Sequence, residues 1–137
     1  MVENTTQQVS DDIDSQTGPQ LPSCDGYTKV RQLGTGTSGV VELMERYNGE
    51  TGRTEQVAMK RLKLSNDPKE RRRQLARIKY EFEMLQKLHE AKLEGIPRYF
   101  EFRQNRRWIT SKGDVDTISY VTMEYIEGFE LNDLVER

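Results

Sequence analysis

The pattern of apolar and polar residues along the chain predicts five strands and one long helix. Short runs that alternate, or that are rich in β-branched and aromatic residues, are typical of strands. Such runs occupy residues 27–33, 40–45, 56–62, 96–102 and 117–125. The polar stretches between them, at 46–56 and 103–116, are expected to be connections, and we find no role for Trp108 in the second.

The helix is expected to begin with Asp67 as N-cap and Pro68 at its first position, and to end near Leu88. Its apolar residues recur at steps of three and four and form one stripe: Leu75, Ile78, Phe82, Leu85 and Leu88. At about 100° per residue, Glu81 lies roughly 50° from the centre of this stripe, where it could meet a partner from the sheet. Glu83 points about 200° further round and is the second choice.

Four arginines on the same helix are expected to form a solvated surface. They are Arg71, Arg72, Arg73 and Arg77. A docking patch for an acidic partner or for phosphate is the other interpretation.

Residues 33–41 read LGTGTSGVV, in which Gly34, Gly36 and Gly39 have the spacing Gly-x-Gly-x-x-Gly. Because glycine has no Cβ, such a turn can bring backbone amides close to an anion. A dinucleotide-binding loop would lead into a helix, and a P-loop would end in Gly-Lys-Ser/Thr. A predicted strand starting at Val40 follows instead. These residues alone leave an ordinary hairpin with a wide turn as an alternative.

Glycines followed by a strand suit a third type of loop, Gly-x-Gly-x-x-Gly-x-Val with a later Val-Ala-x-Lys strand. Residues 57–60 read VAMK and supply that strand. The alternation of a strand places Ala58 and Lys60 on one face, where a small side chain admits a purine ring and an ammonium reaches phosphates. A solvated surface lysine is the plain alternative for Lys60. With these motifs, residues 27–137 resemble the N-terminal lobe of a protein kinase of the Ser/Thr type.

This resemblance implies an α+β fold with a five-stranded antiparallel sheet and one long helix. It implies ATP as the cofactor, with Lys60 and Glu81 as a catalytic pair. The carboxylate of Glu81 would hold the Lys60 ammonium toward the α- and β-phosphates. Met123 would be the gatekeeper beside the adenine.

The resemblance also implies the nucleotide contacts. Leu33 and Val41 would close over the adenine, and the amides near residues 37–39 would cover the phosphates. The Glu124 carbonyl and the Ile126 amide would bind the purine edge, because a strand leaving a sheet has unpaired backbone groups. The complete implied set is Leu33, Gly34, Thr35, Gly36, Thr37, Ser38, Gly39, Val41, Ala58, Lys60, Met123, Glu124, Ile126 and Glu130, with Glu130 near the ribose. A phosphate on Thr37 or Ser38 would oppose that of ATP.

Residues 1–26 contain five acidic residues and no Lys or Arg, so we expect a disordered acidic tail before one domain at 27–137. The remaining 21 basic and 18 acidic residues give the domain a charge of +3. This suits a polyphosphate but is far from the charge of a nucleic-acid binder, so we expect no nucleic-acid partner.

The chain has one cysteine, Cys24, and one histidine, His89, so neither a disulfide framework nor a Cys/His metal site is expected. No secretory signal and no membrane-spanning run is present in the sequence. We therefore expect a soluble, cytoplasmic protein without a membrane partner.

The sequence contains no His-Arg-Asp loop and no Asp-Phe-Gly segment, which supply the catalytic base and the magnesium ligands of protein kinases. We expect a kinase N-lobe truncated before the catalytic loop and inactive by itself. Its C-lobe would be absent, and its protein substrate would be met only in the complete enzyme. The alternative is a non-catalytic lobe that regulates a partner protein, through apolar surface expected to be exposed at Val121, Met123, Phe129 and Leu131.

Overall fold

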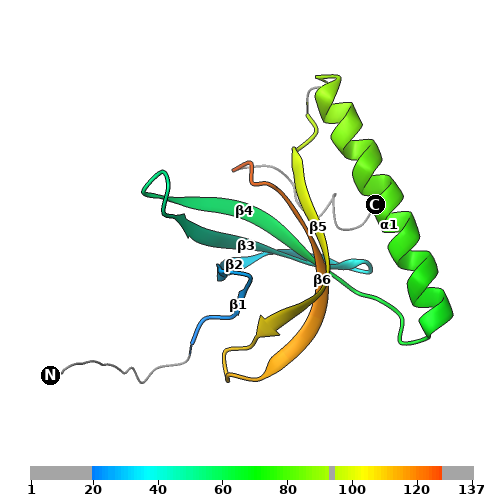
Figure 1. Ribbon diagram of the computed structural model, residues 1–137, viewed down its shortest axis with the longest axis horizontal. Coiled ribbons are helices and arrows are strands. Elements are labelled where there is room, and N and C mark those ends of the chain that lie inside the picture. The colour runs from blue at the N-terminus through cyan, green and yellow to red at the C-terminus, as the bar shows by residue number, and fades with distance from the viewer. Residues whose placement is uncertain (1–19, 93–94, 128–137) are drawn as a thin grey trace, which may run out of the picture.

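A computed structural model describes residues 20–92 and 95–127 of the protein. Six strands form one antiparallel sheet that closes into a barrel, and one long helix packs outside it (Figure 1). The elements are β1 (Ser23–Cys24), β2 (Tyr27–Gly36), β3 (Gly39–Asn48), β4 (Arg53–Leu62), α1 (Pro68–Glu90), β5 (Tyr99–Ile109) and β6 (Val115–Glu124). The barrel order is β1-β2-β3-β4-β6-β5. The prediction of an α+β fold with an antiparallel sheet is confirmed, whereas β1 was not predicted.

Tight turns join the first long strands. Gly36 pairs with Gly39, so only Thr37 and Ser38 connect β2 to β3. The turn between β3 and β4 covers residues 49–52, where the Asn48 side chain accepts hydrogen bonds from the amides of Glu50 and Thr51. Both strands therefore extend into the segment that was expected to be a connection.

The hairpin of β5 and β6 corrects the largest error in the predicted strands. β5 continues to Ile109 and β6 begins at Val115, so the connection covers residues 110–114 rather than 103–116. The segment looked polar because many side chains of β5 are exposed, and because a bulge near Asn105, at φ 57°, breaks the alternation. Trp108 pairs with Asp116 in this hairpin.

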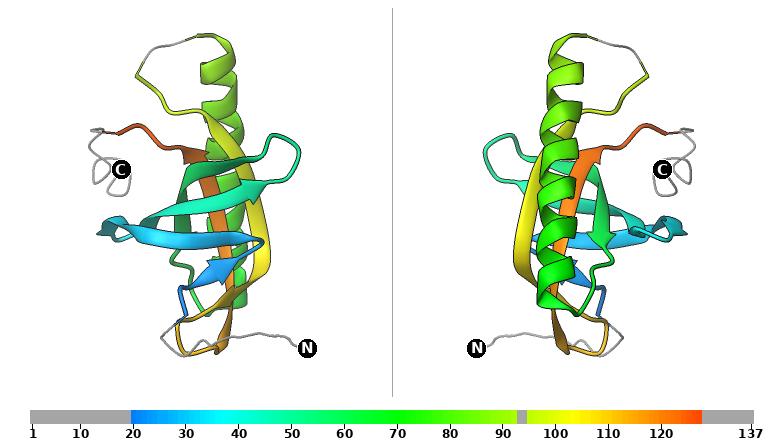
Figure 2. Two further views of the ribbon diagram at one scale, coloured as in Figure 1. Left: turned by 90° about the vertical axis from the view of Figure 1, so that its left-hand side faces the viewer. Right: turned by 90° about the vertical axis from the view of Figure 1, so that its right-hand side faces the viewer.

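The sheet has a buried cluster on each of its two sides. The interior cluster fills the barrel and consists of Cys24, Tyr27, Met44, Val57, Met59, Trp108 and Tyr120, with Ile118 packed against it. The helix-side cluster lies under α1 and consists of Val41, Ala58, Phe82, Val121 and Met123, with five partly buried neighbours. Alternation along β4 divides its residues between the two clusters, as predicted. Figure 2 shows α1 running along the outside of the barrel.

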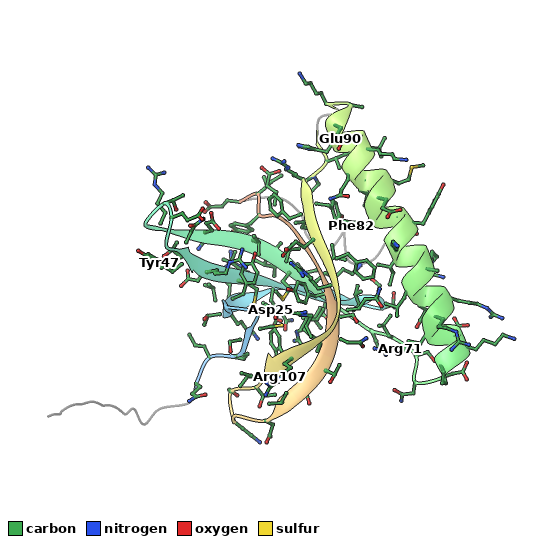
Figure 3. The ribbon with its side chains drawn as sticks, in the orientation of Figure 1. Asp25, Tyr47, Arg71, Phe82, Glu90 and Arg107 are labelled. Carbon is green, nitrogen blue, oxygen red and sulfur yellow. The ribbon has the colours of Figure 1, made fainter. Side chains whose placement is uncertain are left out.

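Helix α1 has the predicted N-terminus. The Asp67 carboxylate accepts a hydrogen bond of 2.9 Å from the Glu70 amide, and Pro68 occupies the first turn. Phe82 is the only buried residue of the helix; it reaches toward β5 (Figure 3) and its ring meets that of Tyr99 edge-on, at 6.0 Å between centroids. Leu88, expected in the buried stripe, is 37% exposed. The helix is therefore held to the sheet along a narrow line.

Residues 23–26 belong to the barrel, although they were assigned to the acidic tail. Asp25 and Gly26 both have positive φ and form a two-residue turn that pairs β1 with β2. Cys24 in β1 is 2% exposed and packs in the interior cluster. Residues 1–19 lie outside the described residues. Within the described part, no helix is long and apolar enough to cross a membrane.

Candidate functional site

A pocket of about 670 Å³ lies between α1, the sheet and the tip of the glycine turn. Its polar and charged lining residues are Thr37, Ser38, Lys60, Lys63, Gln74, Arg77 and Glu81. Its remaining lining residues are apolar or aromatic: Leu62, Leu64, Ile78, Phe82, Met84, Leu85, Tyr99, Val121 and Met123. The pocket is thus a charged rim joined to an apolar wall, the usual composition of a small-molecule site.

Lys60 of β4 and Glu81 of α1, the pair that the family resemblance implies, both line this pocket. Burial lowers the pKa of Lys60, and the charge of Glu81 acts in the opposite direction. The ion pairs formed among the described residues do not include one between Lys60 and Glu81. Glu83 does not line the pocket, which agrees with its place as second choice.

The ladder of the sheet brings several predicted site residues together. Lys60 lies between Val41 of β3 and Val121 of β6, and Ala58 is paired with Met123. Of the predicted set, the pocket is lined by Thr37, Ser38, Lys60, Glu81 and Met123. The predicted residues that do not line it are Leu33, Gly34, Thr35, Gly36, Gly39, Val41, Ala58, Glu124 and Ile126. Glu130 lies outside the described residues.

The last glycine of the turn is needed where two strands approach closely. Gly39 has φ 152°, and a Cβ at this position would collide with the backbone carbonyl oxygen of Arg61. The amide of Lys63 donates a hydrogen bond of 3.0 Å to the Ser38 carbonyl, which ties the tip of the turn to the end of β4. The turn is therefore a tight two-residue hairpin held over the rim of the pocket, not a wide one.

Three residues expected to contact a purine are covered, whereas Glu124 and Ile126 are exposed. Val41 and Ala58 have no exposed surface, and Met123 is 1% exposed. The Glu124 amide donates a hydrogen bond of 2.7 Å to the Arg98 carbonyl. The phosphate half of an ATP site therefore fits the residues present, since Lys60 lies in a pocket with other cations. A purine ring could contact Val41 and Ala58 only after the residues that cover them had moved.

Two cations of the rim were not predicted as site residues. Lys63 follows β4, and Arg77 lies one helical turn before Glu81, on the same side of α1. Lys63 was not predicted because it lies beyond the strand, in a loop whose path the sequence does not reveal. Arg77 was assigned to a solvated surface, with a docking patch for an acidic partner or phosphate as the other interpretation, although its spacing of four residues from Glu81 was a usable signal.

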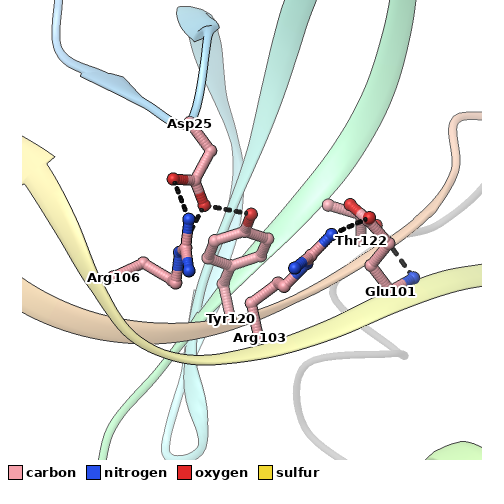
Figure 4. Close-up of polar contacts among 6 residues, drawn as sticks. All are labelled: Asp25, Glu101, Arg103, Arg106, Tyr120 and Thr122. Atoms are coloured by element: carbon pink, nitrogen blue, oxygen red, sulfur yellow. Dashed lines mark hydrogen bonds and ion pairs between the residues drawn. The ribbon is translucent and has the colours of Figure 1, made fainter.

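The opposite side of the sheet holds charges that are already paired. Asp25 accepts two hydrogen bonds of 2.9 Å from Arg106 and one of 2.6 Å from the Tyr120 hydroxyl (Figure 4). The Arg106 hydrogen bond lowers the pKa of Asp25, and burial raises the pKa of the Cys24 thiol to about 12. Cys24 is thus protonated at neutral pH and has no nucleophilic character.

A second ionic group lies inside the barrel. Glu42 is fully buried; its Oε1 accepts a 2.7 Å hydrogen bond from Arg61, and Lys29 Nζ lies 2.8 Å from Oε2 without forming one. The Arg61 guanidinium also covers the Trp108 ring at 4.3 Å. This contact gives Trp108 the role that its sequence context did not reveal.

No protein-family model, no curated protein and no solved structure matches the chain. Among residues 20–92 and 95–127, no group of three or more His, Cys, Asp or Glu side chains could hold a metal ion. The interpretation of the pocket therefore depends on its own residues.

Proposed function

We propose that this chain is the ATP-binding lobe of a protein serine/threonine kinase, which transfers a phosphoryl group from ATP to a protein in the complete enzyme. The main support is the common pocket of Lys60 and Glu81, two residues predicted from separate motifs on different elements. The tip of the glycine turn borders the same pocket, through Thr37 and Ser38.

Within the proposal, Lys60 binds phosphate oxygens and Glu81 orients its ammonium. The half-buried ammonium has no ion pair to a described residue, and the charge of Glu81 offsets the effect of burial on its pKa only in part. An anionic ligand would supply such an ion pair, so the lysine favours an anion in this pocket. ATP, when bound, supplies the phosphoryl group. A catalytic base and magnesium ligands are also required, and this sequence contains neither motif.

Equilibrium titration of the full chain with ATP in the presence of Mg²⁺ tests the proposal. We expect Lys60→Met to weaken ATP binding by about tenfold or more, since a hydrogen bond to a charged group is lost. Lys79→Met serves as control, because Lys79 is on α1 but does not line the pocket. The proposal is wrong if the wild-type chain does not bind ATP, or if Lys60→Met binds it equally well.

An interaction module is the second candidate function, and one surface favours it. Tyr80, Met84 and Leu88 lie at spacings of four residues on α1 and are 63%, 44% and 37% exposed. The exposed patch expected at Val121 and Met123 is not present, because these residues are 5% and 1% exposed. Phe129 and Leu131, the rest of that patch, lie outside the described residues. A folded chain that gives no signal with ATP would favour this function.

A further inference from the structure

We propose that the pocket recognises the phosphate chain of its ligand more than the base, with Lys63 and Arg77 as phosphate-binding residues beside Lys60. This inference rests on the proposed nucleotide-binding function and adds to it the selectivity of the site. It starts from two cations on the pocket rim that no sequence motif explains.

The cations of the pocket differ in exposure. Lys60 is half-buried, whereas Lys63 and Arg77 are exposed, as is the carboxylate residue Glu81. Lys63 lies three positions after Lys60, and three steps along an extended chain correspond to about 10 Å. Glu81 lies four positions after Arg77 on the helix, which corresponds to a rise of about 6 Å along its axis. The positive charge therefore extends along the pocket instead of gathering at one point.

The side chains that line the pocket carry an excess of positive charge, which an anion can neutralise. Three cations and one carboxylate line the pocket, so the net charge of its side chains is +2. None of the three cations forms an ion pair within the part of the chain that the structure describes. A monophosphate would contact only part of this set of cations, whereas a diphosphate or triphosphate is long enough to contact half-buried Lys60 together with an exposed cation. The lining thus fits a chain of linked phosphates.

The tip of the glycine turn lies beside Lys63. The Lys63 amide is bonded to the Ser38 carbonyl, so the backbone of Lys63 and the turn are fixed to each other. The Lys63 side chain is exposed and projects from this fixed point at the pocket rim. An anion bound by Lys63 would consequently lie next to Thr37 and Ser38.

The apolar wall of the pocket has little means of distinguishing one base from another. Phe82, Leu85, Val121 and Met123 line it without a hydrogen-bond donor, and the Tyr99 hydroxyl is the one donor among the apolar and aromatic lining residues. Glu124 and Ile126, expected to bind the purine edge, do not line the pocket. Stacking on such a wall is possible for any base, so selectivity should come from the phosphates.

Titrations of the full chain with ATP, GTP, inorganic tripolyphosphate and AMP, all at one ionic strength, test the inference. We expect similar affinities for ATP and GTP, measurable binding of tripolyphosphate and weaker binding of AMP. Lys63→Gln and Arg77→Gln should each weaken ATP and tripolyphosphate binding by about fivefold and leave AMP binding unchanged. Both residues are exposed, so the variants should fold, which circular dichroism verifies. Lys79→Gln is the matched control.

The outcomes separate this inference from the proposed function. Unchanged ratios of ATP to AMP affinity in Lys63→Gln and Arg77→Gln would refute the phosphate-chain inference but leave ATP binding intact. A strong preference for ATP over GTP would refute it as well. Binding of tripolyphosphate that the two variants weaken, without any binding of ATP, would support the phosphate site and refute the kinase function.

Discussion

The charged side chains on the two sides of the sheet differ in whether they have partners within the described structure. Inside the barrel, Glu42 is fully buried between Lys29 and Arg61. At the end of the barrel, Asp25 is held by Arg106 in the same manner. On the helix side, Lys60 is half-buried in a pocket and has no ion pair with a described residue, although Glu81 lines the same pocket.

This difference separates structural charges from candidate ligand-binding charges. A buried charge with partners inside the fold has its desolvation offset by the protein itself, and its removal mainly affects stability. A partly desolvated charge without a partner is costly unless a ligand completes it, so its removal should affect binding more than folding. Four experiments test the comparison, in order of decreasing expected effect.

Removal of the aromatic ring that fills the barrel should have the largest effect. Trp108 is 4% exposed, so we expect Trp108→Ala to lower the free energy of unfolding by about 3 to 5 kcal/mol. Because Trp108 is the only tryptophan, urea unfolding should be followed by circular dichroism. Tyr47→Ala is the control, since Tyr47 is 67% exposed and its loss should change stability by less than about 0.5 kcal/mol. Equal effects of the two variants would contradict a packed interior.

The glycine at the junction of the turn and β4 should be the next most sensitive position. Gly39→Ala places a Cβ against the Arg61 carbonyl at a φ that favours glycine, so we expect a loss of at least about 2 kcal/mol. Gly49→Ala is the matched control, because nothing lies within 4 Å of its added Cβ. Urea midpoints compare the variants. An unchanged urea midpoint for Gly39→Ala would mean that β3 and β4 do not approach each other closely at Gly39.

A smaller effect, dependent on pH, should follow loss of the Asp25 carboxylate. The Arg106 hydrogen bond lowers the pKa of Asp25, so the ionised form contributes stability above its ordinary pKa of about 4. That contribution disappears as the pH falls through the lowered value of the folded state. Asp25→Asn should therefore be less stable than wild type at pH 7, with the difference narrowing under acid. Thermal melts across this range measure it, and a constant difference would argue against the ion pair.

Replacing Lys60, which has no ion pair with a described residue, should have the smallest effect on stability and should raise it instead of lowering it. Burial lowers the pKa of Lys60, so the folded state loses its proton before the unfolded state does. Stability should thus rise as the pH increases from the folded-state pKa toward the unfolded value near 10.4, at about which it levels off. At pH 7, Lys60→Met should gain a few tenths of a kcal/mol, after allowance for solvent screening. A stability loss in urea titrations would place Lys60 with the structural charges.

The sequence was sufficient to predict features that depend on residues within a single helix or strand. Asp67 and Pro68 determine the start of α1 locally, through a side-chain cap and a fixed φ. The strand period likewise placed Ala58 and Lys60 on one face of β4. These features depend on residues a few positions apart, and such patterns can be read without any knowledge of the fold.

The sequence was insufficient where distant residues decide the structure. β1 closes the barrel by pairing Ser23 with Ile109 of β5, and Asp25 after it meets Arg106, 81 positions away in the chain. Nothing near these residues in the sequence indicates such distant partners. The polar stretch around Trp108 is a strand because its charges lie on the exposed face or against other charges. Burial of Val41 and Ala58, and the place of Lys63 beside the pocket, depend in the same way on what packs across the sheet.

The sequence by itself determined the helix, most of the strands and the face of its own element on which Lys60 and Glu81 each lie, because backbone periodicity fixes which way a side chain points. Only the tertiary structure decided which charges have partners, because pairing depends on distances between elements that no local pattern encodes. That division of paired from unpaired charge distinguishes the barrel from the candidate site.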